Sequence, residues 1–202
     1  MIRSALFALL GLAGSAAAET LPGSYDVNGV AANDVLNIRA EPNARAPIVG
    51  TLPANAHMVE VVGRQGNWGL VNTGEGAGWA YLKYLTRRPG DDWFRLTGTL
   101  RCFGTEPFWS LTLMPAQDTL RREEPGLPEH RLPLGTRQGE AGRATVSFGD
   151  AVAGGDLMME ARACSDGMSD RRFGIAVTGR LRPGLAGNSA ESALTGCCSL
   201  QP

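Results

Sequence analysis

Alternation of apolar and polar residues with a period of two is the feature that most constrains the fold of this chain. It recurs in the second half of the sequence, around residues 96–102, 109–113, 144–148, 157–163 and 173–181. Successive side chains of a strand point to opposite faces, so the pattern predicts antiparallel strands with one buried face. No sustained helical periodicity follows residue 18. The chain is therefore predicted to be all-β, and its second half to close into an antiparallel barrel or sandwich that protects the sheet edges.

Short β-like runs separated by turns also fill the first half of the chain. The high content of chain breakers, 27 Gly and 12 Pro, suits short strands and turns. Residues 25–86 are predicted to form one small β domain and residues 93–202 a second. Residues 87–92 form a polar, breaker-rich linker that few contacts should cross. Residues 115–142 are rich in Pro, Glu, Arg and Gly, which predicts a long excursion with one short strand at 131–134.

The first residues have the pattern of a secretory signal peptide. Arg3 supplies the positive charge, residues 5–13 are apolar, and Ala16 and Ala18 form a cleavage site. The pattern predicts removal of residues 1–18 and a periplasmic or secreted protein. No cysteine follows the cleavage site, so a lipid anchor is not expected. The apolar stretch is too short to span a bilayer and no later segment is apolar enough, so no membrane span is expected.

The charge balance argues against one class of partner. Lys and Arg total 19 and Asp and Glu total 20, which gives a net charge of −1. A protein that binds nucleic acid regardless of sequence needs a basic stripe to neutralise phosphates, so no nucleic-acid partner is expected. The chain has only 2 His, so neither a metal centre nor another cofactor is expected.

Four cysteines lie in the second half of the chain, all after residue 101. In an exported protein an even number of cysteines predicts disulfides. Strand parity puts Cys102 and Cys198 in phase with apolar neighbours, and Cys164 and Cys197 in phase with polar ones. The predicted bridges are therefore Cys102–Cys198 and Cys164–Cys197. A redox-active or metal-binding cysteine site is the alternative, which the lack of a C-x-x-C pair disfavours.

An ordered set of short motifs spans residues 25–85. It comprises Leu36-Asn37-Ile38-Arg39, Glu41-Pro42, Ile48-Val49-Gly50, Val59-Glu60-Val61-Val62-Gly63, Gly66-Asn67-Trp68, Gly78-Trp79-Ala80-Tyr81 and Tyr84-Leu85. With these motifs the segment resembles a bacterial SH3 domain. The resemblance implies a small half-open barrel, with Leu36 and Ile38 in its core, and a non-catalytic module that binds cell-wall or peptide ligands.

The same resemblance implies a ligand-binding groove among aromatic side chains. We expect it near Tyr25, Trp79, Tyr81 and Tyr84. The alternative is that these rings fill the small core, and this interpretation is favoured for Trp68 and Trp79, which are large anchors for so small a domain.

Three motifs stand out in the second domain: Gly104-Thr105-Glu106-Pro107-Phe108-Trp109, Cys164-Ser165-Asp166-Gly167-Met168-Ser169-Asp170-Arg171 and Gly196-Cys197-Cys198. Together they resemble an uncharacterised family of exported bacterial envelope proteins, and the resemblance names no activity. Glu106, Trp109, Asp166 and Asp170 are the motif residues whose role is open. The carboxylates could hold a divalent cation, but their spacing does not fit a helix–loop–helix calcium site. A tight Asp-Gly turn in which Asp170 accepts local backbone N–H groups is the favoured interpretation.

Enzyme classes need residue patterns that this sequence lacks. His130 is the only histidine after Cys102, so a cysteine nucleophile has no evident base. Neither a G-x-S-x-G elbow nor a zinc-ligand spacing occurs. We therefore expect a non-catalytic envelope protein whose SH3-like module docks on peptidoglycan peptide or an envelope protein. One alternative is an envelope stress protein or lysozyme-inhibitor-like protein that acts through the second domain. The other is a hydrolase that uses Glu106 with Asp166 and Asp170.

Overall fold

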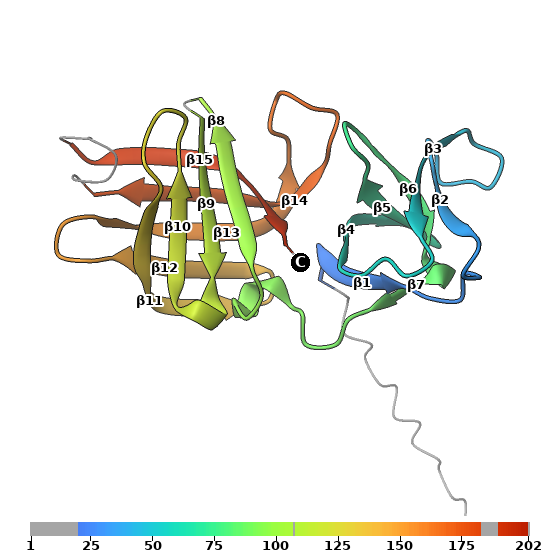
Figure 1. Ribbon diagram of the computed structural model, residues 1–202, viewed down its shortest axis with the longest axis horizontal. Helices are drawn as coiled ribbons and strands as arrows, with labels where there is room; N and C mark the ends of the chain where they lie inside the picture. Colours follow the sequence, from blue (N-terminus) through green and yellow to red (C-terminus); the bar gives the residue numbers. More distant parts are fainter. Residues whose placement is uncertain (1–19, 107, 183–189, 202) are drawn as a thin grey trace, which may run out of the picture.

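The structure, a computed structural model, describes residues 20–106, 108–182 and 190–201, so the predicted signal peptide lies outside the described residues. Two β domains lie next to each other along the long axis of the molecule (Figure 1). Helical elements in the described residues are short 3-10 turns: η1 (Leu82–Tyr84), η2 (Trp93–Arg95) and η3 (Pro115–Gln117). None of the described helices is long and apolar enough to cross a bilayer. The predicted all-β fold class is confirmed.

Short antiparallel strands form the first domain. They are β1 (Gly23–Val27), β2 (Val35–Arg39), β3 (Ile48–Pro53), β4 (Val59–Gln65), β5 (Trp68–Asn72), β6 (Ala77–Tyr81) and β7 (Leu85–Arg87). Their order in the sheet is β3-β2-β6-β5-β4-β1-β7. Alternation along β2 buries Leu36 and Ile38 against Val61, Val71 and Ala80, so the two predicted core residues are confirmed.

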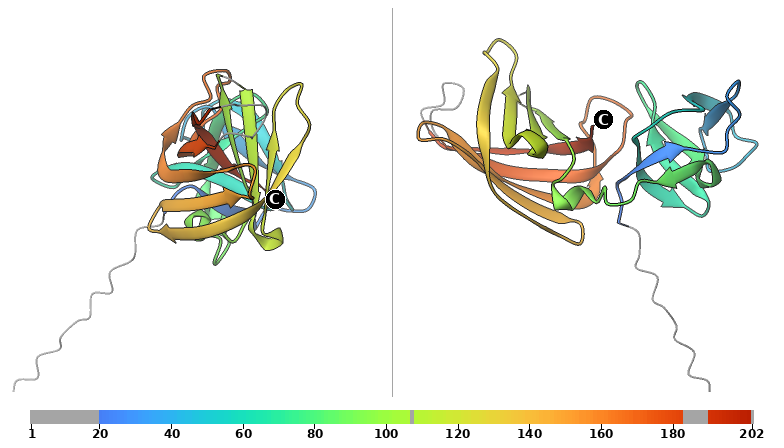
Figure 2. Two further views of the ribbon diagram at one scale, coloured as in Figure 1. Left: turned by 90° about the vertical axis from the view of Figure 1, so that its left-hand side faces the viewer. Right: turned by 60° about the horizontal axis from the view of Figure 1, so that its bottom comes forward.

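The second domain is a closed antiparallel barrel. Its strands are β8 (Leu100–Thr105), β9 (Phe108–Met114), β10 (Thr119–Glu123), β11 (His130–Glu140), β12 (Arg143–Gly149), β13 (Gly154–Cys164), β14 (Phe173–Leu181) and β15 (Ser192–Leu200). Each strand pairs with the next along the chain, and β15 pairs with β8 to close the ring (Figure 2). Closure removes the free edges that an open sheet would expose. Of the two predicted architectures, barrel and sandwich, the structure is the barrel.

The predicted excursion at residues 115–142 is wrong in its main part, because β10 and β11 both lie within it, and the short strand predicted at residues 131–134 is part of the longer β11. Two irregularities hid these strands from the alternation pattern. In β10 the position two residues after Leu120 holds Arg122, whose side chain is buried and pairs with Glu124. In β11 the pairing register shifts between Leu134 and Arg137, which breaks the period of two.

Apolar side chains fill the interior of the barrel. Leu111, Leu157 and Met159 are among its fully buried residues. One end is covered by η2, whose Trp93 and Phe94 join the same core. The chain passes close to η2 at Gly139 on β11, where a Cβ atom would lie 1.5 Å from the Phe94 carbonyl oxygen. The barrel is thus built around a packed core.

Both predicted disulfides are confirmed. Cys102 and Cys198 are directly opposed on β8 and β15, with Cα atoms 3.9 Å apart, so this bridge spans the closing seam of the barrel. Cys164 and Cys197 lie on β13 and β15, with Cα atoms 5.7 Å apart, and both strands pair with β14. Adjacent residues of a strand face opposite ways, which explains why the two neighbouring cysteines take different partners.

The loop between β13 and β14, residues 165–172, rests on the first domain. The Asn72 side chain donates to the Arg172 carbonyl at 2.8 Å and accepts from the Arg172 N–H at 2.9 Å. The Asp170 N–H donates to the Glu75 carbonyl at 3.1 Å. Three hydrogen bonds, each involving a backbone group, therefore join this loop to the first domain.

Glu60 on β4 forms a second link between the domains. Its Oε1 accepts the N–H of Leu200, the last residue of β15, at 3.2 Å. Burial raises the pKa of Glu60 to about 7, although this hydrogen bond and the charge of Arg171 act in the opposite direction.

The predicted linker is held by ion pairs. Arg87 pairs with Asp92 at 3.1 Å, and Arg88 pairs with Asp91 at 2.8 Å. Arg88 also reaches Asp26 on β1 at 3.0 Å. The segment is therefore folded against the first domain, and contacts between the domains are more extensive than its polar composition suggested.

Candidate functional site

A groove of about 670 Å³ lies on the outer surface of the first domain. Its walls come from the β1–β2 loop, β2 and the β2–β3 loop, and its aromatic side comes from Trp68, Tyr81 and Tyr84. We call this the aromatic groove. Trp68 and Tyr81 are paired across β5 and β6, with ring centroids 5.2 Å apart, and the Tyr84 ring follows at 6.3 Å from Tyr81. The three rings thus form a continuous platform.

Strand parity explains why these rings face outward. Val71 and Ala80 on the same two strands are buried in the core. Trp68 and Tyr81 have the opposite phase, so their side chains lie on the other face of the sheet and are half-buried. The interpretation that Trp68 fills the core is therefore wrong. The signal that could have identified it is its register with Tyr81, which sequence alone does not provide.

Two of the four residues expected at the groove line it, and two do not. Tyr81 and Tyr84 are lining residues. Tyr25 is 4% exposed and belongs to the core of the first domain, because it shares the inward phase of Val27 on β1. Trp79 is half-buried opposite Leu70, outside the lining of the groove.

Both charge signs occur at the aromatic groove. Arg39 donates to the Ala46 carbonyl at 2.8 Å, which holds its side chain along the β2–β3 loop. Asp34 accepts the N–H of Val35 at 2.8 Å and lies on the opposite loop. An aromatic platform with one base and one acid suits a ligand that has apolar groups and charges, such as a short peptide.

The three motifs of the second domain meet at one end of the barrel. The Thr105 hydroxyl donates to the Asp166 carbonyl at 3.2 Å, which joins the first motif to the second. A Cβ atom on Gly104 would lie 2.3 Å from Trp109 Nε1, and one on Gly196 would lie 2.0 Å from the Phe103 carbonyl oxygen. Both glycines are therefore required for close packing around Trp109 and the third motif.

Residues of the first two motifs line a pocket of about 700 Å³, which we call the motif pocket. Phe103 and Phe173 form part of its wall, with ring centroids 4.9 Å apart and an interplanar angle of 75°. Sequence reasoning singled out the motifs but missed Phe103 and Phe173, because the barrel must close before β8 and β14 approach each other.

The motif residues with open roles are not brought together as one carboxylate cluster. Glu106 is exposed, and Trp109 is 7% exposed and packs beneath the pocket. Asp170 is exposed and uses its backbone N–H toward the first domain. Within the described ranges, no group of three or more His, Cys, Asp or Glu side chains could hold a metal ion.

Asp166 makes the turn that was expected for Asp170. Its carboxylate accepts the N–H groups of Met168 and Ser169, both at 3.0 Å, and the Ser169 hydroxyl at 2.9 Å. Burial alone raises the pKa of Asp166, but these hydrogen bonds and nearby Arg171 outweigh it, so the pKa is below its ordinary value. The motif therefore forms the predicted Asp-Gly turn, but the residue that accepts the backbone N–H groups is Asp166 and not Asp170.

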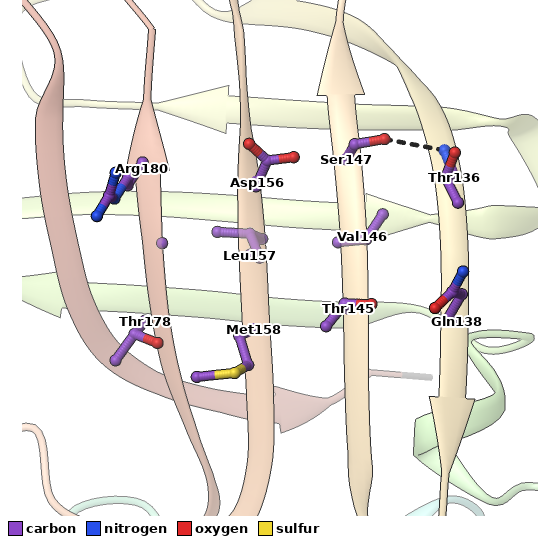
Figure 3. A pocket seen from close by; sticks show the side chains of 11 residues that line it. Thr136, Gln138, Thr145, Val146, Ser147, Asp156, Leu157, Met158, Thr178 and Arg180 are labelled. Atoms are coloured by element: carbon purple, nitrogen blue, oxygen red, sulfur yellow. Dashed lines mark hydrogen bonds between the residues drawn. The ribbon is translucent and has the colours of Figure 1, made fainter.

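A third hollow, of about 480 Å³, lies on the outer wall of β11 to β14. Figure 3 shows its side chains along four neighbouring strands, with the Thr136 N–H donating to the Ser147 hydroxyl at 2.9 Å. Asp156 and Arg180 face each other in the register of β13 and β14. The hollow contains none of the motif residues.

Comparison with known proteins identifies part of the chain. Residues 34–86 match the family model of the bacterial SH3 domain. The match ends before the barrel, so it gives no support to the resemblance noted for the second domain. Neither the curated proteins nor the solved structures contain a significant match to this sequence. Most residues that line the aromatic groove, including Trp68, Tyr81 and Tyr84, lie within residues 34–86, and this segment is thus a bacterial SH3 domain.

Proposed function

We propose that this chain is an exported, non-catalytic binding protein of the bacterial cell envelope, and that its SH3 domain docks on cell-wall peptide through the aromatic groove. The observation that carries the proposal is the platform of Trp68, Tyr81 and Tyr84 within the segment that matches the bacterial SH3 family. Partly exposed aromatic rings beside charged groups are typical of binding surfaces for peptides.

The disulfides support the export part of the proposal. Disulfides persist in oxidising compartments and are rare in the cytosol. Both bridges join strands of the barrel, and together they engage Cys102, Cys164, Cys197 and Cys198. No thiol remains for a cysteine nucleophile, because all four cysteines are bonded.

A pelleting assay with purified peptidoglycan tests the docking site. We expect Tyr81→Ala to weaken binding roughly tenfold, since aromatic anchors dominate such interfaces. Trp79→Ala is the matched control, because Trp79 is an aromatic residue of the same strand outside the groove. Each variant's Tm is measured alongside. Equal binding by the wild-type chain and Tyr81→Ala would exclude the aromatic groove as the docking site.

The runner-up function is inhibition of an enzyme that attacks the envelope, such as a lysozyme, through the second domain. The same samples discriminate the two functions if lysozyme turnover is measured with added protein. Wall binding without a change in lysozyme rate supports docking, whereas a reduced rate with no wall binding supports inhibition.

A further inference from the structure

The acidic side chains of the motif pocket are already engaged by the protein. Glu123 accepts the Ser110 hydroxyl at 3.3 Å and lies 3.6 Å from Arg121. Glu124 pairs with Arg122, which is 4% exposed. Asp166 is occupied by its own loop. These carboxylates are therefore neutralised or held locally and are poor acceptors for a ligand.

The side chains of the two arginines of the pocket make no hydrogen bond or ion pair with the described residues. Arg101 on β8 is exposed and forms no ion pair with any described residue. Arg171 is half-buried, stands over the Phe173 ring at 5.4 Å, and its Nε is buried without a hydrogen-bond partner among the described residues. The charge of Arg171 acts to lower the pKa of nearby Asp166 and Glu60, but the hydrogen bonds that these carboxylates accept come from other groups, such as the N–H groups of Met168 and Leu200. The pocket therefore offers guanidinium groups to an anion.

Apolar and neutral polar groups surround these charges. Phe108 is 52% exposed at the pocket, and Phe103 and Phe173 form the wall beside Arg171. Ser199 and Gln201 line the side near Arg101, since Ser199 is paired with Arg101 across β15 and β8. An exposed aromatic ring at a concave site is a feature of ligand pockets.

We propose that the motif pocket binds the C-terminal carboxylate of a peptide whose last side chain is apolar. Arginine recognises carboxylates through charge-assisted hydrogen bonds, and the phenylalanine rings supply a wall for the apolar side chain. An acidic sugar would present the same carboxylate, but it carries no apolar side chain to cover Phe108. This site lies in the second domain and does not depend on the proposed role of the aromatic groove.

The test uses the full exported chain and small probes whose carboxylate can be removed. N-acetyl-L-phenylalanine is titrated at low ionic strength and followed by NMR, with N-acetyl-L-phenylalaninamide as the uncharged match and glucuronic acid as the sugar arm. Arg101→Gln and Arg171→Gln test the two guanidinium groups. Arg180→Gln is the control, because Arg180 is exposed and lies at the hollow on the outer wall of β11 to β14, away from the motif pocket.

We expect the acid to shift resonances of the motif pocket and to bind at least roughly tenfold more tightly than the amide, since charged hydrogen bonds are stronger than neutral ones. Arg101→Gln and Arg171→Gln should each weaken the acid roughly tenfold and leave the amide unchanged, whereas Arg180→Gln should bind as the wild type does. Equal binding of acid and amide would overturn the proposal, as would tighter binding of glucuronic acid. Arg101 is exposed, so its substitution keeps the test valid even if Arg171→Gln misfolds.

Discussion

The two candidate sites are assembled in different ways. The aromatic groove lies on the outer face of an open sheet, and its residues come from one compact stretch between Gly29 and Tyr84. The motif pocket lies at one end of a closed barrel and needs segments that are far apart in the chain, such as Thr105 and Asp166. The first site is therefore a property of a local module, whereas the second exists only when the ring of strands is closed and its loop is supported.

Removal of the seam disulfide should have the largest effect, and it should destabilise the barrel without destabilising the first domain. Cys102 and Cys198 are 96 residues apart, and a bridge over a loop of about 100 residues is worth about 4.7 kcal/mol in the chain-entropy model. The pair Cys102→Ala and Cys198→Ala should lower the free energy of unfolding of the barrel by an amount of that order. Unfolding of the barrel is followed by the NMR indole signals of Trp93 and Trp109, which are resolved from those of Trp68 and Trp79 in the first domain. Wall binding by the first domain should persist, and its loss would show that the domains do not fold independently.

A glycine substitution tests the packing of the motif end. Gly196→Ala places a Cβ atom 2.0 Å from the Phe103 carbonyl oxygen, so we expect a loss of about 1–3 kcal/mol in barrel stability from overpacking. Gly98→Ala is the matched control, since nothing described lies within 4 Å of its Cβ position. Denaturant unfolding measures both. Similar stabilities for the two variants would contradict the close packing of β8 against β15.

The link through Glu60 predicts a pH dependence of domain docking. Its pKa is raised from 4.5 to about 7, so the docked state prefers the protonated form. The contact between the two domains is therefore most stable below about pH 4.5, and it weakens as the pH rises from there to about 7. Since Glu60 is half-buried and partly screened, we expect a change of about 1 kcal/mol.

Glu60→Gln should remove this dependence, because the amide oxygen can still accept the Leu200 N–H but does not titrate. Small-angle scattering at pH 5 and pH 8 reports the distance between the domains. The wild type should extend at pH 8 and Glu60→Gln should not, with Glu41→Gln on an exposed loop as the control. Extension of all three proteins alike at pH 8 would assign the effect to another group.

An effect of similar size, but confined to one loop, concerns the support of the β13–β14 loop. Asn72→Ala removes two hydrogen bonds to the Arg172 backbone, which are worth about 1 kcal/mol together in a partly exposed setting. We expect faster amide exchange in residues 165–172 and weaker probe binding at the motif pocket. The aromatic groove should be unaffected, because Asn72 is not among its lining residues. Unchanged exchange in the loop would mean that the first domain does not support it.

Sequence reasoning predicted the regular parts of the molecule and missed those that depend on register. Alternating apolar residues identified most barrel strands, and parity identified both disulfides, since each depends only on the phase of a strand. β10 was missed because the buried pair of Arg122 with Glu124 interrupts the apolar phase, and most of β11 was missed because its pairing register shifts.

The candidate sites show the same division. Tyr81 and Tyr84 followed from the family motifs, whereas Trp68 required the pairing of β5 with β6. The prediction that Tyr25 lines the groove was wrong, because Tyr25 shares the inward phase of Val27 on β1 and is buried in the core. Arg101 and Arg171 could not be connected from sequence, because only closure of the barrel and folding of the β13–β14 loop bring them to one pocket.

The central claim is that the aromatic groove of the SH3 domain holds cell-wall peptide. Its most direct test is an NMR titration of the isotopically labelled chain with soluble stem peptide released from peptidoglycan. We predict that the indole signal of Trp68 and the amides of Tyr81 and Tyr84 shift together along one binding curve, while the indole signal of Trp79 moves little. Shifts confined to the barrel, or no shift at saturating peptide, would contradict the account.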